Sequence, residues 1–171
     1  MGVEEKLQYD PVDLAVDIIV NVQGDEPFVQ RNALEKLLQV FDHNNVEKVQ
    51  VASLMQLMQD QENIDDPNYV KVAIDKNWNA LFFSRSVIPY PRSRETNINY
   101  YEHIGVYAFT KNILMSFTKW EQTPLEMAEK IECLRYLENG ISMKMVLVDY
   151  MGVEIDTPED LIKAANFISG T

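Results

Sequence analysis

Two aspartates stand directly after apolar runs, where they could bind a metal ion. The run "VDIIVNV" (16–22) is followed by "QGDEP", which carries Asp25 and Glu26, and "GVEIDTPEDL" carries Asp156 just after a late apolar run. Mg²⁺ takes oxygen ligands and shares its coordination sphere with water and substrate phosphates. Asp25 and Asp156 are therefore candidate Mg²⁺ ligands. The structural alternatives are a turn at "GDEP" and a favourable helix-dipole position for Asp156.

The pattern of elements around these aspartates places both in loops that follow strands. Residues 17–22 form a continuous apolar run, typical of a strand buried on both faces, and residues 31–41 carry apolar side chains at helical spacing. Runs at 49–55 and 144–150 predict further strands. In open α/β sheets, ligands bind beyond the carboxyl ends of the strands. We therefore expect the two carboxylates at neighbouring strand ends.

The middle of the chain predicts antiparallel strands followed by helices. "YVKVAID" and "ALFFSRS" predict a hairpin joined by "KNWN", residues 59–68 and 87–99 predict loops, and "YYEHIGVYAFT" predicts another strand. The segment 123–140 predicts one helix that begins with a capping box at Thr123 and Glu126. This order of elements predicts a single three-layer α/β domain.

Composition limits the possible partners. Twenty-seven acids against fifteen bases give a formal net charge of -12, which disfavours nucleic acid and anionic membrane surfaces. Cys133 is the only cysteine, so no intrachain disulfide can form, and its position predicts a small buried side chain. No secretory pattern is present, and no apolar run approaches the ~18 residues of a membrane span. We expect a cytoplasmic protein with small-molecule substrates, no nucleic acid and no membrane partner.

Five segments together carry a resemblance to a known enzyme family. They are "VNVQGDEPFV", "DPNYVKVAIDKNWNALFFSRSVIPYPR", "YYEHIGVYAFT", "TPLEMAEKIECLRYLENG" and "GVEIDTPEDL", in order over nearly the whole chain. They resemble the 3-deoxy-manno-octulosonate cytidylyltransferases, also called CMP-Kdo synthetases. The resemblance implies a nucleotide-diphospho-sugar-transferase-like (Rossmann-like) mixed sheet. It also implies transfer of CMP from CTP to 3-deoxy-D-manno-octulosonate (Kdo) for lipopolysaccharide biosynthesis, with release of pyrophosphate, Mg²⁺ as cofactor and a homodimeric assembly.

The resemblance also implies roles for individual residues. Asp25 and Asp156 become the metal ligands, and the sugar-acid contacts are Gln23, Arg85, Arg92, His103, Tyr107 and Glu132. A guanidinium group can hold a carboxylate on two N–H groups, which suits the two arginines.

The residues alone leave structural alternatives open for each of these roles. Arg85 could be a cross-strand salt-bridge partner and Arg92 a solvated loop cation. His103 could be a structural histidine, Tyr107 a core residue and Glu132 an exposed helix acid. Lys71 could reach phosphate or solvent, and Glu126 is explained by its capping position.

Two departures from the family pattern affect these expectations. The family has glutamine where this chain has Cys133, which affects one polar contact of the sugar pocket. The family also begins with a Gly-, Arg- and Lys-bearing loop around the CTP triphosphate, and this sequence does not contain it. We therefore expect residues 1–171 to form one N-terminally truncated domain, corresponding to the C-terminal two-thirds of the enzyme.

The expected truncation leaves three functions open. An unpaired sheet edge predicts self-association, and binding of CTP without the loop stays open. Besides Kdo transfer, the chain could be a cytidylyltransferase for a nine-carbon sialic acid or a non-catalytic dimerising remnant. The segments "SRSVIPYPR" and "EHIGVYAF" favour Kdo.

Overall fold

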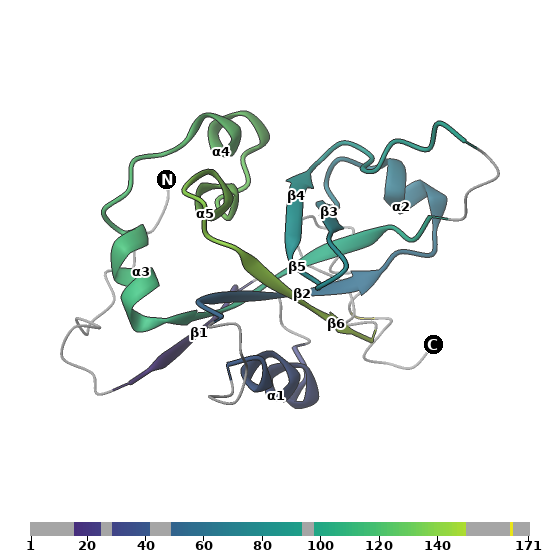
Figure 1. Ribbon diagram of the computed structural model, residues 1–171. Helices are drawn as coiled ribbons and strands as arrows, with labels where there is room; N and C mark the ends of the chain where they lie inside the picture. Colours follow the sequence, from purple (N-terminus) through teal and green to yellow (C-terminus); the bar gives the residue numbers. More distant parts are fainter. Residues whose placement is uncertain (1–15, 25–28, 42–48, 94–97, 150–164, 166–171) are drawn as a thin grey trace.

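The computed structural model describes residues 16–24, 29–41, 49–93, 98–149 and 165. The described part forms one mixed sheet with helices on both faces (Figure 1), which confirms the predicted three-layer α/β architecture. The predicted metal ligands Asp25 and Asp156 lie outside the described residues. None of the helices in the described ranges combines the length and apolar character needed to cross a bilayer.

The described sheet has six strands. They are β1 (Ile18–Val22), β2 (Val51–Leu57), β3 (Lys71–Ile74), β4 (Ala80–Ser84), β5 (Tyr101–Thr110) and β6 (Met143–Val148). The order is β4-β3-β5-β2-β6, and β1 pairs with the second half of β5. Strand β5 is antiparallel to β1, β2 and β3, whereas β2 and β6 are parallel. Strands β1, β2 and β6 therefore point in the same direction.

Helices cover the sheet on both sides. The helices are α1 (Arg31–Gln39), α2 (Gln61–Asp65), α3 (Lys111–Phe117), α4 (Pro124–Glu129) and α5 (Leu134–Glu138). Helix α1 buries Ala33 and Leu37 on one face of the sheet, below it in Figure 1, against β2, β5 and β6. Helices α3 and α5 pack their apolar residues on the opposite face, where Leu134 is fully buried. Two apolar cores thus enclose the central strands.

The predicted hairpin is confirmed, and its turn reaches β6. The Asp75 carboxylate accepts hydrogen bonds from the backbone N–H groups of Asn77 and Asn79, both at 2.8 Å, which fixes the turn between β3 and β4. Trp78 takes a positive φ of 63° at its tip. The Met145 backbone N–H then donates to the Trp78 carbonyl at 2.7 Å. The turn of the hairpin therefore contacts β6, the strand at the opposite end of the strand order from β4.

The helices differ from the sequence expectation in three places. The segment 59–68, expected to be a loop, contains the short helix α2. The single helix expected over 123–140 is two helices, α4 and α5, because Lys130 takes the left-handed conformation with φ 57° and ends α4. The capping box at Thr123 and Glu126 is present as predicted. Helix α3 was not predicted at all.

Strand β1 also differs from expectation. The run was expected to be buried on both faces, but its residues are half-buried or exposed, and it pairs with β5 alone among the described strands. The carboxyl ends of β1 and β6 lie at the same edge of the sheet, as expected for strands that point the same way. They are not neighbours, because β5 and β2 lie between them. The expectation of adjacent strand ends was therefore wrong.

Candidate functional site

A cavity of about 300 Å³ lies on the α3 and α5 side of the sheet. Its lining residues come from β1, β5, α3, α5 and the segment that leads into α5: Ile19, Val20, Asn21, Tyr107, Phe109, Leu114, Phe117, Glu132, Cys133 and Tyr136. This volume is at the lower end of the range of small-molecule sites, about 300–1,000 Å³. The wall is mostly aromatic and aliphatic, with a few polar groups. Such a lining suits a compact organic ligand that packs on the rings and meets the few polar side chains with its own polar groups.

The pairing of β1 with β5 brings polar side chains to one side of this cavity. Asn21 pairs with Tyr107, and both line the cavity. Gln23, two residues further along the chain, lies over Gly105: a Cβ atom at Gly105 would come within 3.0 Å of the Gln23 Oε1. Side chains alternate along a strand, so Gly105 and Tyr107 share a face. Gly105 thus leaves space for Gln23 beside the cavity.

Tyr107 and Cys133 form a polar contact inside the cavity wall. Their side chains are hydrogen-bonded to each other. Burial raises the pKa of the Tyr107 hydroxyl and also that of the Cys133 thiol. Cys133 is 2% exposed, as the sequence predicted for a small buried side chain. Both groups are therefore neutral, and the thiol is not an activated nucleophile.

Glu132 lies at the rim of the cavity, beside a buried arginine. Its side chain is 68% exposed, and its Oε1 atom lies 3.7 Å from Arg135 Nη2. Arg135 is itself held by Glu126: Nε donates to Oε2 at 2.7 Å and Nη2 donates to Oε1. The guanidinium carbon lies 4.2 Å from the centroid of the Phe117 ring. Because Phe117 and Glu132 both line the cavity, Arg135 connects two parts of its wall.

His103 lies on β5 close to Tyr107 but outside the cavity lining. Its Nε2 atom is 2.9 Å from the Ser53 hydroxyl, and its ring centroid lies 4.9 Å from that of Phe83 and 5.3 Å from that of Tyr107. Burial lowers the pKa of His103 to about 4. The ring is therefore neutral near neutral pH.

The predicted basic contacts lie outside the cavity lining. Arg85 donates to the backbone carbonyls of Glu129 at 2.9 Å and Pro67 at 3.0 Å, which connects α4 to the loop before β3. Arg92 is exposed in the loop after β4. The expectation that Lys71 reaches phosphate or solvent was wrong, because its side chain is fully buried.

Two backbone carbonyls satisfy the buried ammonium group of Lys71. Its Nζ atom donates to the carbonyls of Asp66 at 2.8 Å and Tyr69 at 2.6 Å. Burial lowers the pKa of this group. The structure thus brings Gln23, Tyr107 and Glu132 to the cavity and places the predicted cationic contacts elsewhere.

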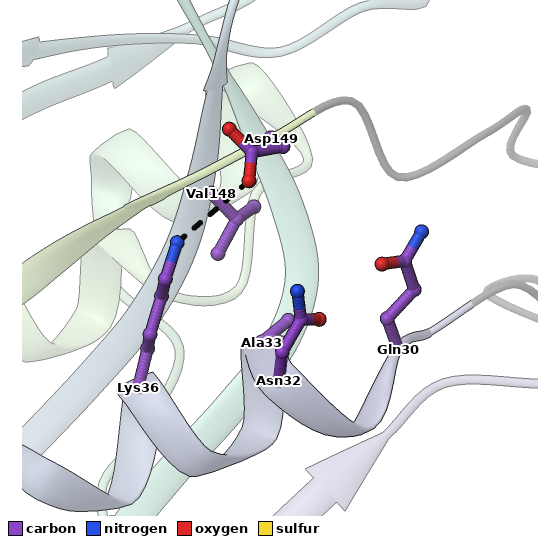
Figure 2. A pocket seen from close by; sticks show the side chains of 6 residues that line it. All are labelled: Gln30, Asn32, Ala33, Lys36, Val148 and Asp149. Carbon is purple, nitrogen blue, oxygen red and sulfur yellow. Dashed lines mark ion pairs between the residues drawn. The ribbon is translucent and has the colours of Figure 1, made fainter.

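A second, much smaller hollow lies at the carboxyl edge of the sheet. Its volume is about 10 Å³, and it is lined by Gln30, Asn32, Ala33, Lys36, Val148 and Asp149. Figure 2 shows Lys36 and Asp149 pointing toward one another across it, with Nζ and Oδ2 3.9 Å apart. In the described ranges, no group of three or more His, Cys, Asp or Glu residues is placed to hold a metal ion. Val148, the last residue of β6, is part of this lining.

Three residues of the site were not found by sequence reasoning. Asn21 and Ser53 are polar residues inside apolar strands, and that interruption was an available signal. Arg135 carried no such signal, because its partner Glu126 is nine residues away on a different helix. Only the folded chain brings these two side chains together.

Comparison with known proteins places this site in context. The model of the family described as "Cytidylyltransferase" matches residues 4–146. The chain is 50% identical over 157 residues to the 3-deoxy-manno-octulosonate cytidylyltransferase of Christiangramia forsetii, a match that covers 92% of this chain and 63% of that protein. It is 40% identical to the Fusobacterium nucleatum protein of the same name, over 89% of this chain and 61% of that protein. The chain thus spans about 63% of the first of these relatives.

Solved structures show the same fold. A CMP:2-keto-3-deoxy-manno-octonic acid synthetase complexed with CTP superposes with a TM-score of 0.83 at 33% identity, over 92% of this chain and 64% of that one. The 4-diphosphocytidyl-2C-methyl-D-erythritol synthase of Anaerococcus prevotii gives a TM-score of 0.53 at 16% identity, over 90% of this chain and 59% of that one. The second similarity concerns the fold alone.

Proposed function

Because this chain belongs to the cytidylyltransferase family, we propose that it serves the transfer of CMP from CTP to 3-deoxy-D-manno-octulosonate, with release of pyrophosphate. One observation carries the proposal: Tyr107 and Glu132, from distant parts of the chain, line a single cavity with Gln23 beside it. The relatives that match most of this chain carry the name of this activity. In this proposal the product enters lipopolysaccharide biosynthesis.

The proposed sugar-acid site is the cavity between β1, β5 and α5. Asn21, Tyr107 and Glu132 offer amide, hydroxyl and carboxylate groups to the hydroxyl groups of the sugar. Phe109 and Phe117 supply the apolar part of the wall. A few polar groups in an apolar wall fix the orientation of a bound ligand. The chain's own contribution is therefore to bind and orient the sugar acid.

We propose that Asp25 and Asp156 hold Mg²⁺. Strands β1 and β6, which precede these aspartates in the sequence, run in the same direction and end at the same edge of the sheet. Carboxylates are the oxygen ligands that Mg²⁺ prefers, and the ion would neutralise charge on the nucleotide phosphates. A chain with a formal net charge of -12 repels a free triphosphate, and a bound cation offsets this.

The reaction itself needs little covalent help from the protein. The anomeric hydroxyl of the sugar acid attacks the α-phosphorus of CTP, its proton leaves, and the bond to the pyrophosphate group breaks. Catalysis of such a step depends on alignment of the two reactants and on stabilisation of phosphate charge. In this proposal the cavity residues align the sugar acid.

The assembly and the compartment are also proposals. Leu81, on β4, is 62% exposed, and Trp78, in the adjoining turn, is 40% exposed. Exposed apolar side chains on neighbouring elements favour a protein contact. We propose a homodimer that covers the β3–β4 hairpin, and sedimentation equilibrium tests it. A single cysteine, Cys133, fits the reducing cytoplasm.

Pyrophosphate release tests the proposed reaction. The assay contains Mg²⁺ and CTP, with either Kdo or N-acetylneuraminic acid as acceptor. It is run with this chain and with a longer form that restores the length of the relatives. Release that depends on Kdo supports the proposal. Release with the nine-carbon acid alone favours the sialic-acid alternative, and no release in either form favours the non-catalytic alternative.

Two sets of variants test the proposed residues. Asp25→Asn and Asp156→Asn should each abolish turnover in the active form while the circular dichroism spectrum stays unchanged; near-normal rates would remove the metal assignment. Glu132→Gln should raise the KM for Kdo more than that for CTP. Glu35→Gln is the matched control, because Glu35 pairs with Arg31 on the exposed side of α1.

A further inference from the structure

The pairing of β2 with β5 contains an irregularity beside His103. Ser53 lies opposite Tyr107, whereas the next residue, Leu54, lies opposite Ile104. Two residues of β5 therefore have no counterpart in β2, as in a bulge. The backbone carbonyls of Ile104 and Val106 both approach the Ser53 hydroxyl, at 3.2 Å and 2.9 Å. At this point the Ser53 hydroxyl contacts backbone carbonyls of β5 where a regular pair of strands would have backbone hydrogen bonds.

The Ser53 hydroxyl has three polar neighbours but only one hydrogen. Two of them, the carbonyls of Ile104 and Val106, can only accept a hydrogen bond. The third is Nε2 of His103, at 2.9 Å. Ser53 is fully buried, so an unmet hydrogen bond here costs its full desolvation penalty.

The hydrogen on Nε2 decides how many of the three contacts are satisfied: with it only the Ile104 carbonyl lacks a hydrogen, and without it two acceptors do. If Nε2 carries a hydrogen, His103 donates to Ser53, and Ser53 donates to the nearer carbonyl, that of Val106. If Nε2 carries none, the single Ser53 hydrogen must serve either the ring or a carbonyl. The remaining acceptors would then face the hydroxyl oxygen without any hydrogen between them.

We propose that Ser53 is a positioning residue that fixes His103 in the Nε2–H tautomer, so that Nδ1 is the ring's hydrogen-bond acceptor. Burial supports a neutral ring, since it lowers the pKa of His103 to about 4. The Phe83 ring, at an interplanar angle of 67° to the imidazole, and the tilted Tyr107 ring pack against it and restrict its rotation.

The tautomer defines what His103 can offer a substrate; this step rests on the proposed function. With Nε2 engaged by Ser53, any hydrogen bond to the sugar acid uses Nδ1 as acceptor. Its partner must then be a hydroxyl group, because a carboxylate has no hydrogen to donate. A contact of His103 with the acceptor sugar is therefore limited to a hydroxyl group and excludes the carboxylate.

Nitrogen-15 NMR of the histidine rings tests the tautomer without any activity. The chain has two histidines, and a His43→Gln variant leaves only the ring of His103. Two-bond proton–nitrogen correlations near neutral pH should show the Nε2–H pattern. The Nδ1–H pattern, or an average of the two tautomers, would overturn the proposal. This spectrum decides the tautomer even if a Ser53 variant does not fold.

Variants of Ser53 test its positioning role. Ser53→Ala should reduce the population of the Nε2–H tautomer, and Ser53→Thr, which keeps the hydroxyl, should restore it. Ser116→Ala is the matched control, because the Ser116 hydroxyl donates within α3, to the carbonyl of Asn112 at 3.0 Å. If Ser53→Ala keeps the full Nε2–H pattern, Ser53 does not set the tautomer.

Kinetics in the active, longer form test the substrate role. Ser53→Ala should raise the KM for Kdo by about fivefold, the value of one hydrogen bond, and leave the KM for CTP nearly unchanged. It should cause no further rise in a His103→Ala background; an additive rise would overturn the role of Ser53 through His103. If no form uses Kdo while the spectrum shows the Nε2–H tautomer, the proposed function fails and the tautomer stands.

Discussion

Replacement of Arg135 by methionine should strongly destabilise the fold. The Arg135 and Glu126 side chains are 10% and 6% exposed, and two nitrogens of the guanidinium group donate to the two carboxylate oxygens. Methionine preserves much of the apolar volume over Phe117 but leaves the Glu126 carboxylate with two uncharged partners, the Thr123 backbone N–H at 3.2 Å and the Gln122 side chain. A buried charge would thereby lose its partner.

The size of the effect follows from this geometry. Removal of one partner of a buried ion pair costs about 3–5 kcal/mol, because the other charge stays buried. The total stability of a domain is only about 5–15 kcal/mol. For a chain of this length, the loss corresponds to a fall of roughly 10 °C in Tm. The double variant Arg135→Met with Glu126→Gln should recover about half of the loss, since no charge is then left unpaired.

Urea unfolding followed by circular dichroism measures this loss. Glu35→Gln is the control, because it removes an exposed pair on α1 with a distance of 2.8 Å and should cost about 0.5 kcal/mol or less. A loss below about 1 kcal/mol in Arg135→Met, or no recovery in the double variant, would refute the assignment of a buried, mutually dependent pair.

Three further predictions concern single side chains. Because burial lowers the pKa of His103 from 6.5 to about 4, its contribution is complete above about pH 6.5 and is lost as the pH falls toward 4. Between about pH 7 and pH 4, urea unfolding should show about 3 kcal/mol more loss in the wild type than in His103→Gln; equal losses would contradict this. The Cys133 thiol is buried and its pKa is raised, so it should react with Ellman's reagent only after denaturation; a rapid reaction in the folded protein would show access to the thiol. Lys71→Met should lower the unfolding free energy by about 1–3 kcal/mol, because two buried carbonyls lose their donor; an unchanged urea midpoint would show that other groups replace it.

Local signals predicted the fold where the structure depends on nearby residues. The capping box at Thr123, the hairpin and the strands β2, β5 and β6 follow from short-range patterns, and all are present. The break between α4 and α5 could not be predicted in this way. Lys130 takes a left-handed conformation, which glycine or asparagine usually adopts and lysine does not. There Ile131 is buried in the core, and this tertiary packing overrides helix propensity.

The candidate site was predictable only in part, for the same reason. Family resemblance indicated Tyr107 and Glu132, which line the cavity, and Gln23, which lies beside it. Arg85 was expected to meet a carboxylate, but its guanidinium group contacts two backbone carbonyls, a pairing that only the folded chain creates. The metal assignment of Asp25 and Asp156 stays a prediction.

The turn of the β3–β4 hairpin has a consequence for how copies of this protein can meet. Strand β6 ends the strand order of the described sheet, and its outer side would otherwise offer backbone groups to a foreign strand. The Trp78 carbonyl takes up the Met145 N–H, Asn79 bridges to Lys144, and the Lys144 ammonium group bonds to the Asn77 carbonyl. The turn of the β3–β4 hairpin thereby covers part of the outer edge of β6. Edge-to-edge pairing of two chains along β6 would first require the hydrogen bonds between this turn and β6 to break.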